Sequence, residues 1–254
     1  MIPSPILKAL STIRKHQVQH LLMGGQACVL YGAAEFSRDL DLALLPDPAN
    51  LDRLRAALDE LQAEVIAVPP FLPEHLAEGL AVHFRCAHPE AAGLRIDVMT
   101  RMRGLEPFDV LWQRRTTFEL GEETVDALSL PDLIAAKKTQ RDKDWPMIRR
   151  LVDVNYTTYR EQPTPQRIAF WLRELRTPEF LVEAVRAYAD AARKETEARP
   201  LLQWATRKGV DNGALARALR EEEDAERSAD SEYWRPLREK LSRLRRKTRL
   251  PQDE

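Results

Sequence analysis

The sequence predicts an α/β (α+β) protein, with a small mixed sheet flanked by helices in its first half and helices alone in its second half. Short apolar runs alternate with segments of helical spacing in the first half, which is typical of strands and helices packed in layers. From Ser129 onward the apolar residues follow a helical period almost throughout. The clearest linker is the Gln-Pro-Thr-Pro segment at residues 162–165. We therefore expect two domains, residues 1–160 and residues 161–254.

Apolar side chains of the first half recur either in short continuous runs or every three to four residues. Helical spacing is clearest where Leu51, Leu54, Leu58 and Leu61 fall on one helix face. The later strands can pair in either direction on this pattern alone. In chain order the expected elements are helix Pro3–Gln17, strand His20–Met23, helix Gln26–Tyr31, strand Leu40–Leu45, helix Leu51–Leu61, and strands Val82–Cys86 and Leu94–Met99.

Helices are expected throughout the second half. Pro131 follows Ser129 at the position of a first helical turn, where the missing N–H of proline does no harm. A further helix is expected over Asp144–Tyr159, and the linker follows it. Breaks between the later helices are expected where proline or glycine interrupts the pattern, at Thr177-Pro178, Arg199-Pro200 and Asp211-Asn212-Gly213.

The composition excludes several classes of protein. With 254 residues, 44% apolar residues and a net charge of −1, the chain can bury a core and is neither disordered nor a strongly basic nucleic-acid binder. It contains no run of about 18 apolar residues and no signal-peptide pattern. Cys28 and Cys86 are expected to be free thiols in a reducing compartment. We therefore expect a cytoplasmic protein without membrane contact.

Two aspartates one residue apart, Asp39 and Asp41, are the first candidates for chemistry. On a strand, side chains two residues apart point to the same face. The two carboxylates would therefore repel each other unless a positive charge lies between them. Mg²⁺ prefers carboxylate oxygens together with substrate phosphates, and it would supply that charge. The pair predicts a metal site.

Gly24 and Gly25 precede this pair by a spacer of thirteen residues. A glycine pair before a helix can be a simple tight turn. Without Cβ atoms, however, these residues also let backbone N–H groups approach phosphate oxygens closely. A helix beginning at Gln26 would direct its positive end at the same anion. The spacing to the aspartates favours the phosphate-binding interpretation.

A third carboxylate, Asp97, lies within the apolar segment Ile96-Asp97-Val98. It is either a solvent-facing residue of an edge strand or the third member of the acidic set. Two metal ions about 4 Å apart need three or more carboxylates to orient them, which favours the second interpretation. Asp97 would hold the catalytic metal and could take the proton from an attacking hydroxyl. His83 and His88 bracket a neighbouring strand and could flank the site, but they lack the spacing of a zinc site.

Lys137, Arg141 and Asp144 form a charged set further along the chain. Their spacing of i, i+4 and i+7 would place them on one stripe of a continuous helix. Such a stripe is either a solvated surface or a positive pair that faces a triphosphate and stabilises the departing pyrophosphate.

Together these motifs resemble a known superfamily. The apolar-Gly-Gly motif at residues 23–25, the Asp-x-Asp motif at residues 39–41 and the apolar-Asp-apolar motif at residues 96–98 are similar to those of the DNA polymerase β-type nucleotidyltransferases. More closely, Leu-Ile-Ala-Ala-Lys at residues 133–137 and Arg-Asp-Lys-Asp at residues 141–144 resemble the helical motif of the AbiEii-like bacterial nucleotidyltransferases. That group includes toxins of toxin–antitoxin and phage-defence systems. The resemblance implies a nucleotidyltransferase fold for the first domain.

The resemblance covers about residues 15–155 and implies a metal-dependent enzyme that uses a nucleoside triphosphate (NTP) such as ATP. The sequence departs from the pattern at Glu35, because relatives often carry an arginine four residues before the first aspartate. The implied metal, Mg²⁺ or Mn²⁺, would be held by Asp39, Asp41 and Asp97. The implied nucleotide contacts are Gly24, Gly25, Ser37, Arg38, Lys137, Arg141 and Asp144.

The expected reaction is transfer of a nucleoside monophosphate from an NTP to an acceptor hydroxyl, with release of pyrophosphate. The toxin-like resemblance implies RNA, specifically tRNA, as the acceptor and a cognate antitoxin as a further partner. Residues 235–249 support RNA, because they contain eight basic residues and one acidic residue, Glu239. A solvated basic helix, or one lying against the acidic stretch at residues 221–226, fits the same segment.

Two rival functions stay open on the sequence alone. The first is a small-molecule nucleotidyltransferase of the antibiotic-modifying type, which would bind RNA weakly. The second is a catalytically silent nucleotide- or RNA-binding module. The retained carboxylates argue against a silent module, because mutually repelling side chains have no purpose there.

Overall fold

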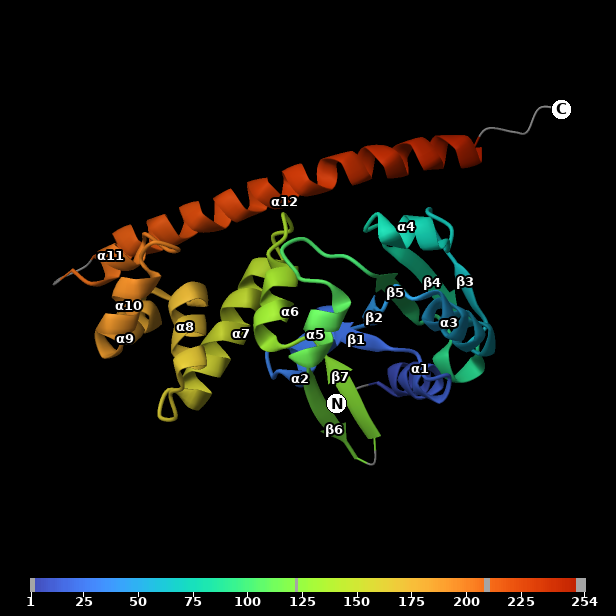
Figure 1. The fold of residues 1–254 in the computed structure, drawn as a ribbon, viewed down its shortest axis with the longest axis horizontal. Coiled ribbons are helices and arrows are strands. Elements are labelled where there is room, and N and C mark those ends of the chain that lie inside the picture. Colours follow the sequence, from blue (N-terminus) through green and yellow to red (C-terminus); the bar gives the residue numbers. More distant parts are fainter. Residues whose placement is uncertain (1–2, 122, 208–210, 250–254) are drawn as a thin grey trace. The chain divides into compact units, whose positions relative to one another are not determined.

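The computed structural model describes residues 3–121, 123–207 and 211–249 (Figure 1). They fall into two compact units. The first, Met1–Ala136 with Glu232–Glu254, contains the sheet, and the second, Lys137–Ser231, is helical. The predicted domain boundary at residue 160 stays a prediction, because close packing does not by itself show which part of a chain folds alone.

A seven-stranded mixed sheet forms the centre of the first unit, with the strand order β3-β4-β5-β2-β1-β7-β6. β2 lies in the middle, parallel to β5 and antiparallel to β1. The strands are β1 (His20–Met23), β2 (Asp39–Leu44), β3 (Ala63–Val65), β4 (Val82–Cys86), β5 (Arg95–Met99), β6 (Thr116–Leu120) and β7 (Glu123–Ala127). The mixed sheet with its helices confirms the predicted fold class.

Helices accompany this sheet, and local sequence explains where several of them form. α1 buries Ile6, Leu10 and Ile13 on one face. The Asp47 side chain caps α3 by accepting a hydrogen bond from the Asn50 N–H at 3.0 Å. The helices are α1 (Ser4–Lys15), α2 (Gly24–Leu30), α3 (Pro48–Glu60), α4 (Pro73–Ala77), the 3-10 helix η1 (Pro89–Ala91), α5 (Phe108–Gln113) and α6 (Leu130–Lys137).

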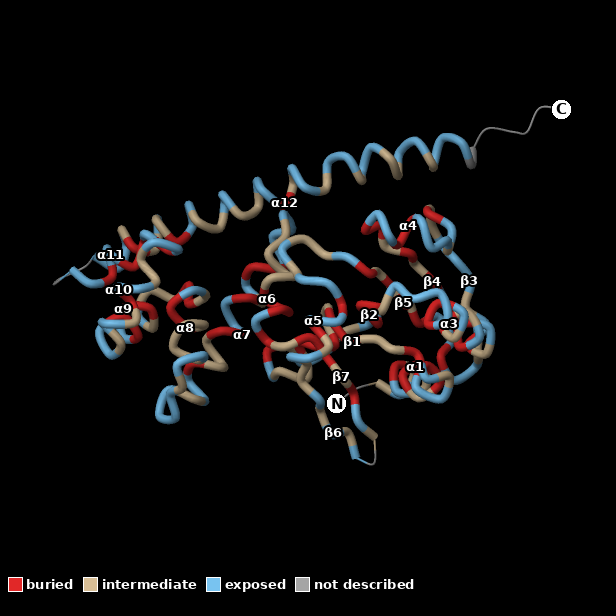
Figure 2. The backbone as a smooth tube through the Cα atoms, viewed as in Figure 1, coloured by how far each residue is buried: buried red, intermediate tan, exposed pale blue. Residues whose placement is uncertain are grey.

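β2 separates core side chains from polar ones. Leu40, Leu42 and Leu44 are fully buried on one face, whereas Asp39 is exposed and Asp41 is partly exposed on the other. Figure 2 shows buried backbone along the central strands. A shift of one residue would bury both aspartates, so the apolar pattern fixes the register of this strand.

The described residues of the second unit form helices and no strand. Its core is aromatic, and Tyr156 packs edge-to-face against Trp171 with ring centroids 5.2 Å apart. The buried Arg199 donates a hydrogen bond of 2.8 Å to Glu222. The helices are α7 (Asp144–Tyr159), α8 (Pro165–Glu174), α9 (Pro178–Ala187), α10 (Ala189–Glu195), α11 (Leu202–Ala205) and the first part of α12 (Asn212–Arg249). The predicted helix over Asp144–Tyr159 is confirmed. The segment at residues 162–165 lies inside the second unit, and its role as a linker between domains stays a prediction.

The last part of α12 belongs to the first unit. Lys240 forms an ion pair with Glu78, which follows α4. The Tyr233 hydroxyl lies 3.9 Å from the position that a Cβ on Gly79 would take. The chain therefore returns to its first unit after the helices of the second.

Several elements between residues 63 and 127 were not predicted from the sequence. β3 has no buried residue and β6 none either, so neither carries an apolar run. α4 and α5 have only 5 and 6 residues, which is too short for a helical period to appear. The predicted start of a helix at Gln26 is wrong, because α2 begins at Gly24 and the glycine pair forms its first turn.

None of the described helices is long and apolar enough to span a membrane. Cys28 and Cys86 are buried free thiols, as predicted. Burial raises the pKa of the Cys86 thiol to about 11. This thiol is therefore protonated at neutral pH and unsuited to act as a nucleophile.

Candidate active site

The central strands bring the three predicted carboxylates to one face of the sheet. The parallel register of β2 and β5 places Asp41 opposite Asp97 and Asp39 opposite Arg95. Side chains at paired positions of neighbouring strands point to the same side, and such strands lie about 4.8 Å apart. Asp97 is largely enclosed, with 16% of its side chain exposed. Two motifs far apart in the sequence therefore meet in the fold.

Gly24 and Gly25 are required by the side chains that pack against them. Gly24 has a φ of +65°, and a Cβ there would lie 1.8 Å from Asp41 Oδ2. A Cβ on Gly25 would lie 2.3 Å from Ser37 Oγ. The Gly25 N–H also donates a long hydrogen bond of 3.4 Å to Asp41 Oδ2. The glycine pair thus makes room for Asp41 and Ser37, and its contact with phosphate stays a prediction.

Asp97 forms a polar network with Arg95 and His83. Its Oδ1 accepts hydrogen bonds from Arg95 Nε at 2.7 Å and from His83 Nδ1 at 2.9 Å. Arg95 Nη2 lies 3.1 Å from the same His83 Nδ1. A ring nitrogen either donates or accepts, so the tautomer that donates to Asp97 cannot accept from Arg95.

Charge stabilises this network. Burial raises the pKa of Asp97, but the hydrogen bonds from His83 and Arg95 outweigh it, so the pKa of that carboxyl lies below its usual value. The hydrogen bond to Asp97 raises the pKa of Arg95, burial lowers it, and the charges of Asp39 and Asp41 raise it further. At neutral pH one protonated guanidinium therefore lies in the field of three carboxylates.

His83 contacts Asp97, as expected for a residue that flanks the site. His88 lies apart from this network, where its Nδ1 accepts a hydrogen bond of 3.2 Å from the Glu90 N–H beside η1. No sequence motif points to Arg95. Its spacing of two residues from Asp97 on a strand is the signal that both side chains share one face.

The donor set suits a hard divalent cation in its chemistry, because three carboxylates supply only oxygen ligands. Among the described residues, however, no group of three or more His, Cys, Asp or Glu side chains is arranged to hold a metal ion. Asp97 Oδ1 accepts from Arg95 and His83, and Asp41 Oδ2 accepts from the Gly25 N–H. A metal ion therefore reaches these two oxygens, Asp97 Oδ1 and Asp41 Oδ2, only when their present partners move away.

The segment before β2 carries a hydroxyl and a cation next to the aspartates. The Ser37 carbonyl accepts a hydrogen bond of 2.8 Å from Gln26 Nε2, which ties the segment to α2. The guanidinium of Arg38 lies 6.0 Å from the centre of the exposed Phe36 ring. Glu35 is exposed. Arg38 is thus an exposed cation that precedes Asp39 in the sequence, whereas residue 35 is acidic.

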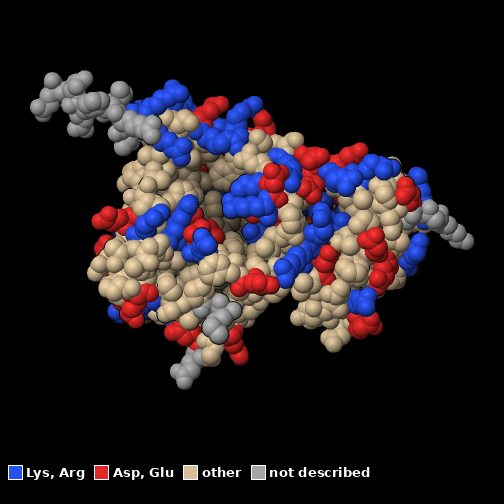
Figure 3. Space-filling model, turned by 180° about the vertical axis from the view of Figure 1, so that it is seen from behind, with Lys and Arg blue, Asp and Glu red and all other residues tan. Residues whose placement is uncertain are grey.

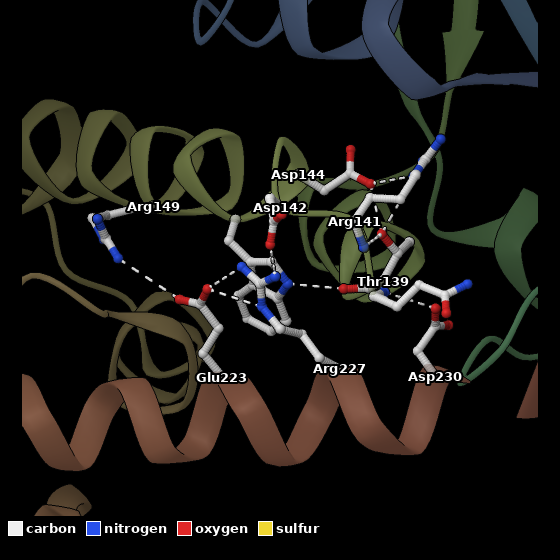
Figure 4. A network of polar contacts seen from close by, with 10 residues as sticks. Thr139, Arg141, Asp142, Asp144, Arg149, Glu223, Arg227 and Asp230 are labelled. Carbon is white, nitrogen blue, oxygen red and sulfur yellow. Dashed lines mark hydrogen bonds and ion pairs between the residues drawn. The ribbon is translucent and has the colours of Figure 1, made fainter. Parts of the chain in front are cut away.

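Lys137, Arg141 and Asp144 lie in the second unit, and the predicted helical stripe is wrong. α6 ends at Lys137 and α7 begins at Asp144, so Arg141 lies in the connecting turn. Asp144 accepts hydrogen bonds from Thr139 Oγ1 at 2.6 Å and from Arg141 Nε at 2.8 Å (Figure 4). Its other oxygen lies 3.4 Å from Lys137 Nζ. The Asp144 carboxylate thus contacts Thr139, Arg141 and Lys137. These residues lie at a turn between two helices and not along one continuous helix.

Asp144 is nearly enclosed, with 5% of its side chain exposed. Burial raises the pKa of Asp144, but the charges of Lys137 and Arg141 and the hydrogen bond from Thr139 outweigh it, and the pKa lies below its usual value. The Arg141 side chain is 58% exposed. Its other N–H groups can therefore still reach a ligand.

Among the comparisons with known proteins, one family model covers most of the chain. A family model described as nucleotidyl transferase AbiEii toxin, type IV toxin–antitoxin system, matches residues 19–247. A solved protein from H. pylori with a provisional assignment as a nucleotidyltransferase is 15% identical, with 89% of this chain and 95% of that chain covered and a TM-score of 0.39. Nothing is concluded from so distant a likeness. No curated protein matches the chain.

Proposed function

Since the chain belongs to the AbiEii family of nucleotidyltransferase toxins of type IV toxin–antitoxin systems, we propose that it transfers a nucleoside monophosphate from an NTP to an RNA hydroxyl. The proposed reaction depends on a divalent metal and releases pyrophosphate. The observation that carries the proposal is the pairing of Asp41 with Asp97 across β2 and β5, with Asp39 on the same face.

Asp39, Asp41 and Asp97 would hold Mg²⁺ or Mn²⁺. When bound, such a cation neutralises the carboxylates and orients the triphosphate for in-line attack. Ionised Asp97 can accept the proton of the attacking hydroxyl, although its lowered pKa makes it a weak base. His83 donates to Asp97 Oδ1 and keeps that carboxylate in position.

The proposed phosphate contacts of the first unit lie beside these aspartates. Ser37 Oγ lies against Gly25, whose N–H points toward Asp41. Arg38 is exposed next to Asp39 and can pair with a phosphate oxygen.

The second unit contributes its own proposed nucleotide contacts: Lys137, Arg141 and Asp144. The exposed guanidinium of Arg141 supports this role, and Asp144 would position both cations.

RNA is the proposed acceptor because of the basic end of α12. Four arginines and a serine line one face of this helix together with a single acidic residue: Arg235, Arg238, Ser242, Arg243, Arg246 and Glu239. Figure 3 shows Lys and Arg side chains gathered where α12 ends. Such a face suits a polyphosphate backbone. We propose tRNA as the acceptor, and the type of toxin suggests a cognate antitoxin as a functional partner.

Label transfer tests the proposed reaction. Purified protein is incubated with Mg²⁺, each α-labelled NTP in turn, and tRNA. We expect labelled RNA with at least one NTP, and we expect Asp41→Asn to reduce the rate at least about 100-fold, because a lost ligand removes both charge and orientation. The control is Asp52→Asn, at an exposed aspartate of α3 that forms an ion pair with Arg55 three residues further on.

The outcomes separate the rival functions. Labelled small molecules without labelled RNA would favour the antibiotic-modifying type of enzyme. If no NTP gives any product, or if Asp41→Asn transfers label as fast as Asp52→Asn, the proposed active site is wrong.

A further inference from the structure

Arg95 occupies an unusual electrostatic position in the first unit. It is paired with Asp39 across β2 and β5, and it is two residues from Asp97 on the same strand face. Its Nε donates to Asp97 Oδ1 at 2.7 Å. Asp39 and Asp41 also act on its charge. One guanidinium is therefore the counter-charge of the whole acidic set.

A simple ion pair between two residues of β5 is the plainer interpretation of this contact. The Arg95 side chain is 38% exposed, and ion pairs with that much solvent contact add little to stability. The contact does have a definite electrostatic effect, because it neutralises repulsion among carboxylates that would otherwise attract another cation. The position of Arg95 thus bears on ligand binding more than on folding.

The same oxygen cannot serve two cations at full strength. Asp97 Oδ1 already accepts from Arg95 and from His83. A divalent cation bound to this carboxylate would also be repelled by the guanidinium at short range. His83, in contrast, can keep donating to Asp97, because carboxylates that bind a metal are commonly hydrogen-bonded in turn.

We propose that Arg95 and a divalent cation compete for Asp97, so that the metal binds only as the guanidinium leaves Oδ1. Arg95 then sets the metal affinity of the site, and it is a positioning residue that acts through Asp97. The inference rests on the metal site of the proposed function.

Mn²⁺ alone is the probe, with free ion measured by its electron paramagnetic resonance signal at low ionic strength. We expect Arg95→Gln to lower the Kd for Mn²⁺ at least about fivefold, because removal of the competing cation strengthens the field of the carboxylates. Arg85→Gln is the matched control, because Arg85 is exposed on β4 directly opposite Arg95. It removes the same charge from the same sheet without removing the bond to Asp97. Arg95→Lys, which keeps the charge, should bind Mn²⁺ as weakly as the wild type.

Equal Mn²⁺ affinity of Arg95→Gln and Arg85→Gln would overturn the competition. Asp41→Asn distinguishes this result from failure of the metal site itself. If Asp41→Asn binds Mn²⁺ as tightly as the wild type, the proposed metal site is wrong. If it loses binding while Arg95→Gln matches its control, only the competition is wrong.

A measurement on the wild-type protein covers the case in which Arg95→Gln does not fold. The side-chain Nε–Hε resonance of Arg95, assigned by its loss in Arg95→Lys, is followed by NMR during titration with diamagnetic Mg²⁺. Competition predicts that this resonance shifts and loses its protection from exchange with water as Mg²⁺ binds. An unchanged resonance at saturating Mg²⁺ contradicts it.

Discussion

At Gly24, a hydrogen atom in place of a methyl group leaves room for the Asp41 carboxylate. A Cβ would lie 1.8 Å from Asp41 Oδ2, and the backbone has a φ of +65°. We expect Gly24→Ala to destabilise the protein by about 1–3 kcal/mol through backbone strain. We expect nucleotidyl transfer to fall at least about tenfold, because small displacements of reacting groups are costly. Chemical unfolding and label transfer measure the two effects.

Gly32 offers a matched control for this substitution. Its φ of +76° is similar, but a Cβ there would meet nothing within 4 Å. Gly32→Ala should therefore lose a comparable amount of stability and keep its activity. Equal loss of activity in both variants would show that contact with Asp41 is not the cause.

Among the elements, the turn between α6 and α7 depends on one enclosed carboxylate. Asp144 is 5% exposed and Lys137 is 11% exposed, and Asp144→Asn would leave that cation without its partner. We expect a loss of about 3 kcal/mol in the free energy of unfolding, as is typical when one member of a buried ion pair is removed. Asp190→Asn, which affects an exposed pair with Arg193, should change stability by less than about 0.5 kcal/mol. Urea unfolding at neutral pH tests both.

The pH dependence of this effect has a definite sign. The pKa of Asp144 lies below its usual value of 3.8 in the folded protein. Its charge therefore contributes stability above pH 3.8, and the contribution is lost as the pH falls through the lowered pKa. The difference between wild type and Asp144→Asn should shrink below that pH. A difference that grows in acid would contradict the assignment of Asp144 as an ionised, paired residue.

Elements with strong patterns could be predicted from the sequence. β1 has the predicted bounds because it is a short apolar run, and β4 has them because apolar and polar residues alternate along it. α7 has them because its buried residues recur at helical spacing. β6 and β7 could not be predicted in this way, since their residues are largely polar and their pairing with each other stabilises them. The turn at residues 138–143 escaped prediction because tertiary hydrogen bonds to Asp144 outweigh local helix propensity.

The candidate site could be predicted only where local spacing determines it. Asp39 and Asp41 share a face through spacing alone. That Asp97 meets Asp41 and that Arg95 meets Asp39 both follow from the register of β2 and β5. The register is set by long-range pairing, which no local pattern of a single sequence specifies. The shared face of Arg95 and Asp97, in contrast, follows from their spacing of two residues on β5.

On the scale of the whole molecule, a net charge of −1 conceals an uneven distribution. Arg243 and Arg246 are exposed near the end of α12. We expect the double variant Arg243→Glu/Arg246→Glu to weaken tRNA binding at least about tenfold and to reduce the salt dependence of log K by about 0.7–0.9 per lost phosphate contact. Fluorescence anisotropy over a series of salt concentrations measures both.

A control for this prediction lies on the same helix. Arg217 and Arg220 are exposed near the start of α12, so Arg217→Glu/Arg220→Glu makes the same change in net charge. If both double variants bind tRNA alike, the basic end of α12 is not an RNA-binding surface and only overall charge matters.

The first unit is assembled from two distant parts of the chain, residues 1–136 and residues from 232 onward. A ribosome adds about 5–20 residues per second, so the strands that carry Asp41 and Asp97 emerge many seconds before the segment that bears Lys240. During that interval the nascent chain contains Asp41 and Asp97, but the part of the first unit that begins at residue 232 is still missing. The first unit can therefore be completed only after α12 has been synthesised. Until then, the strands that carry Asp41 and Asp97 lack the contacts that α12 makes with their unit.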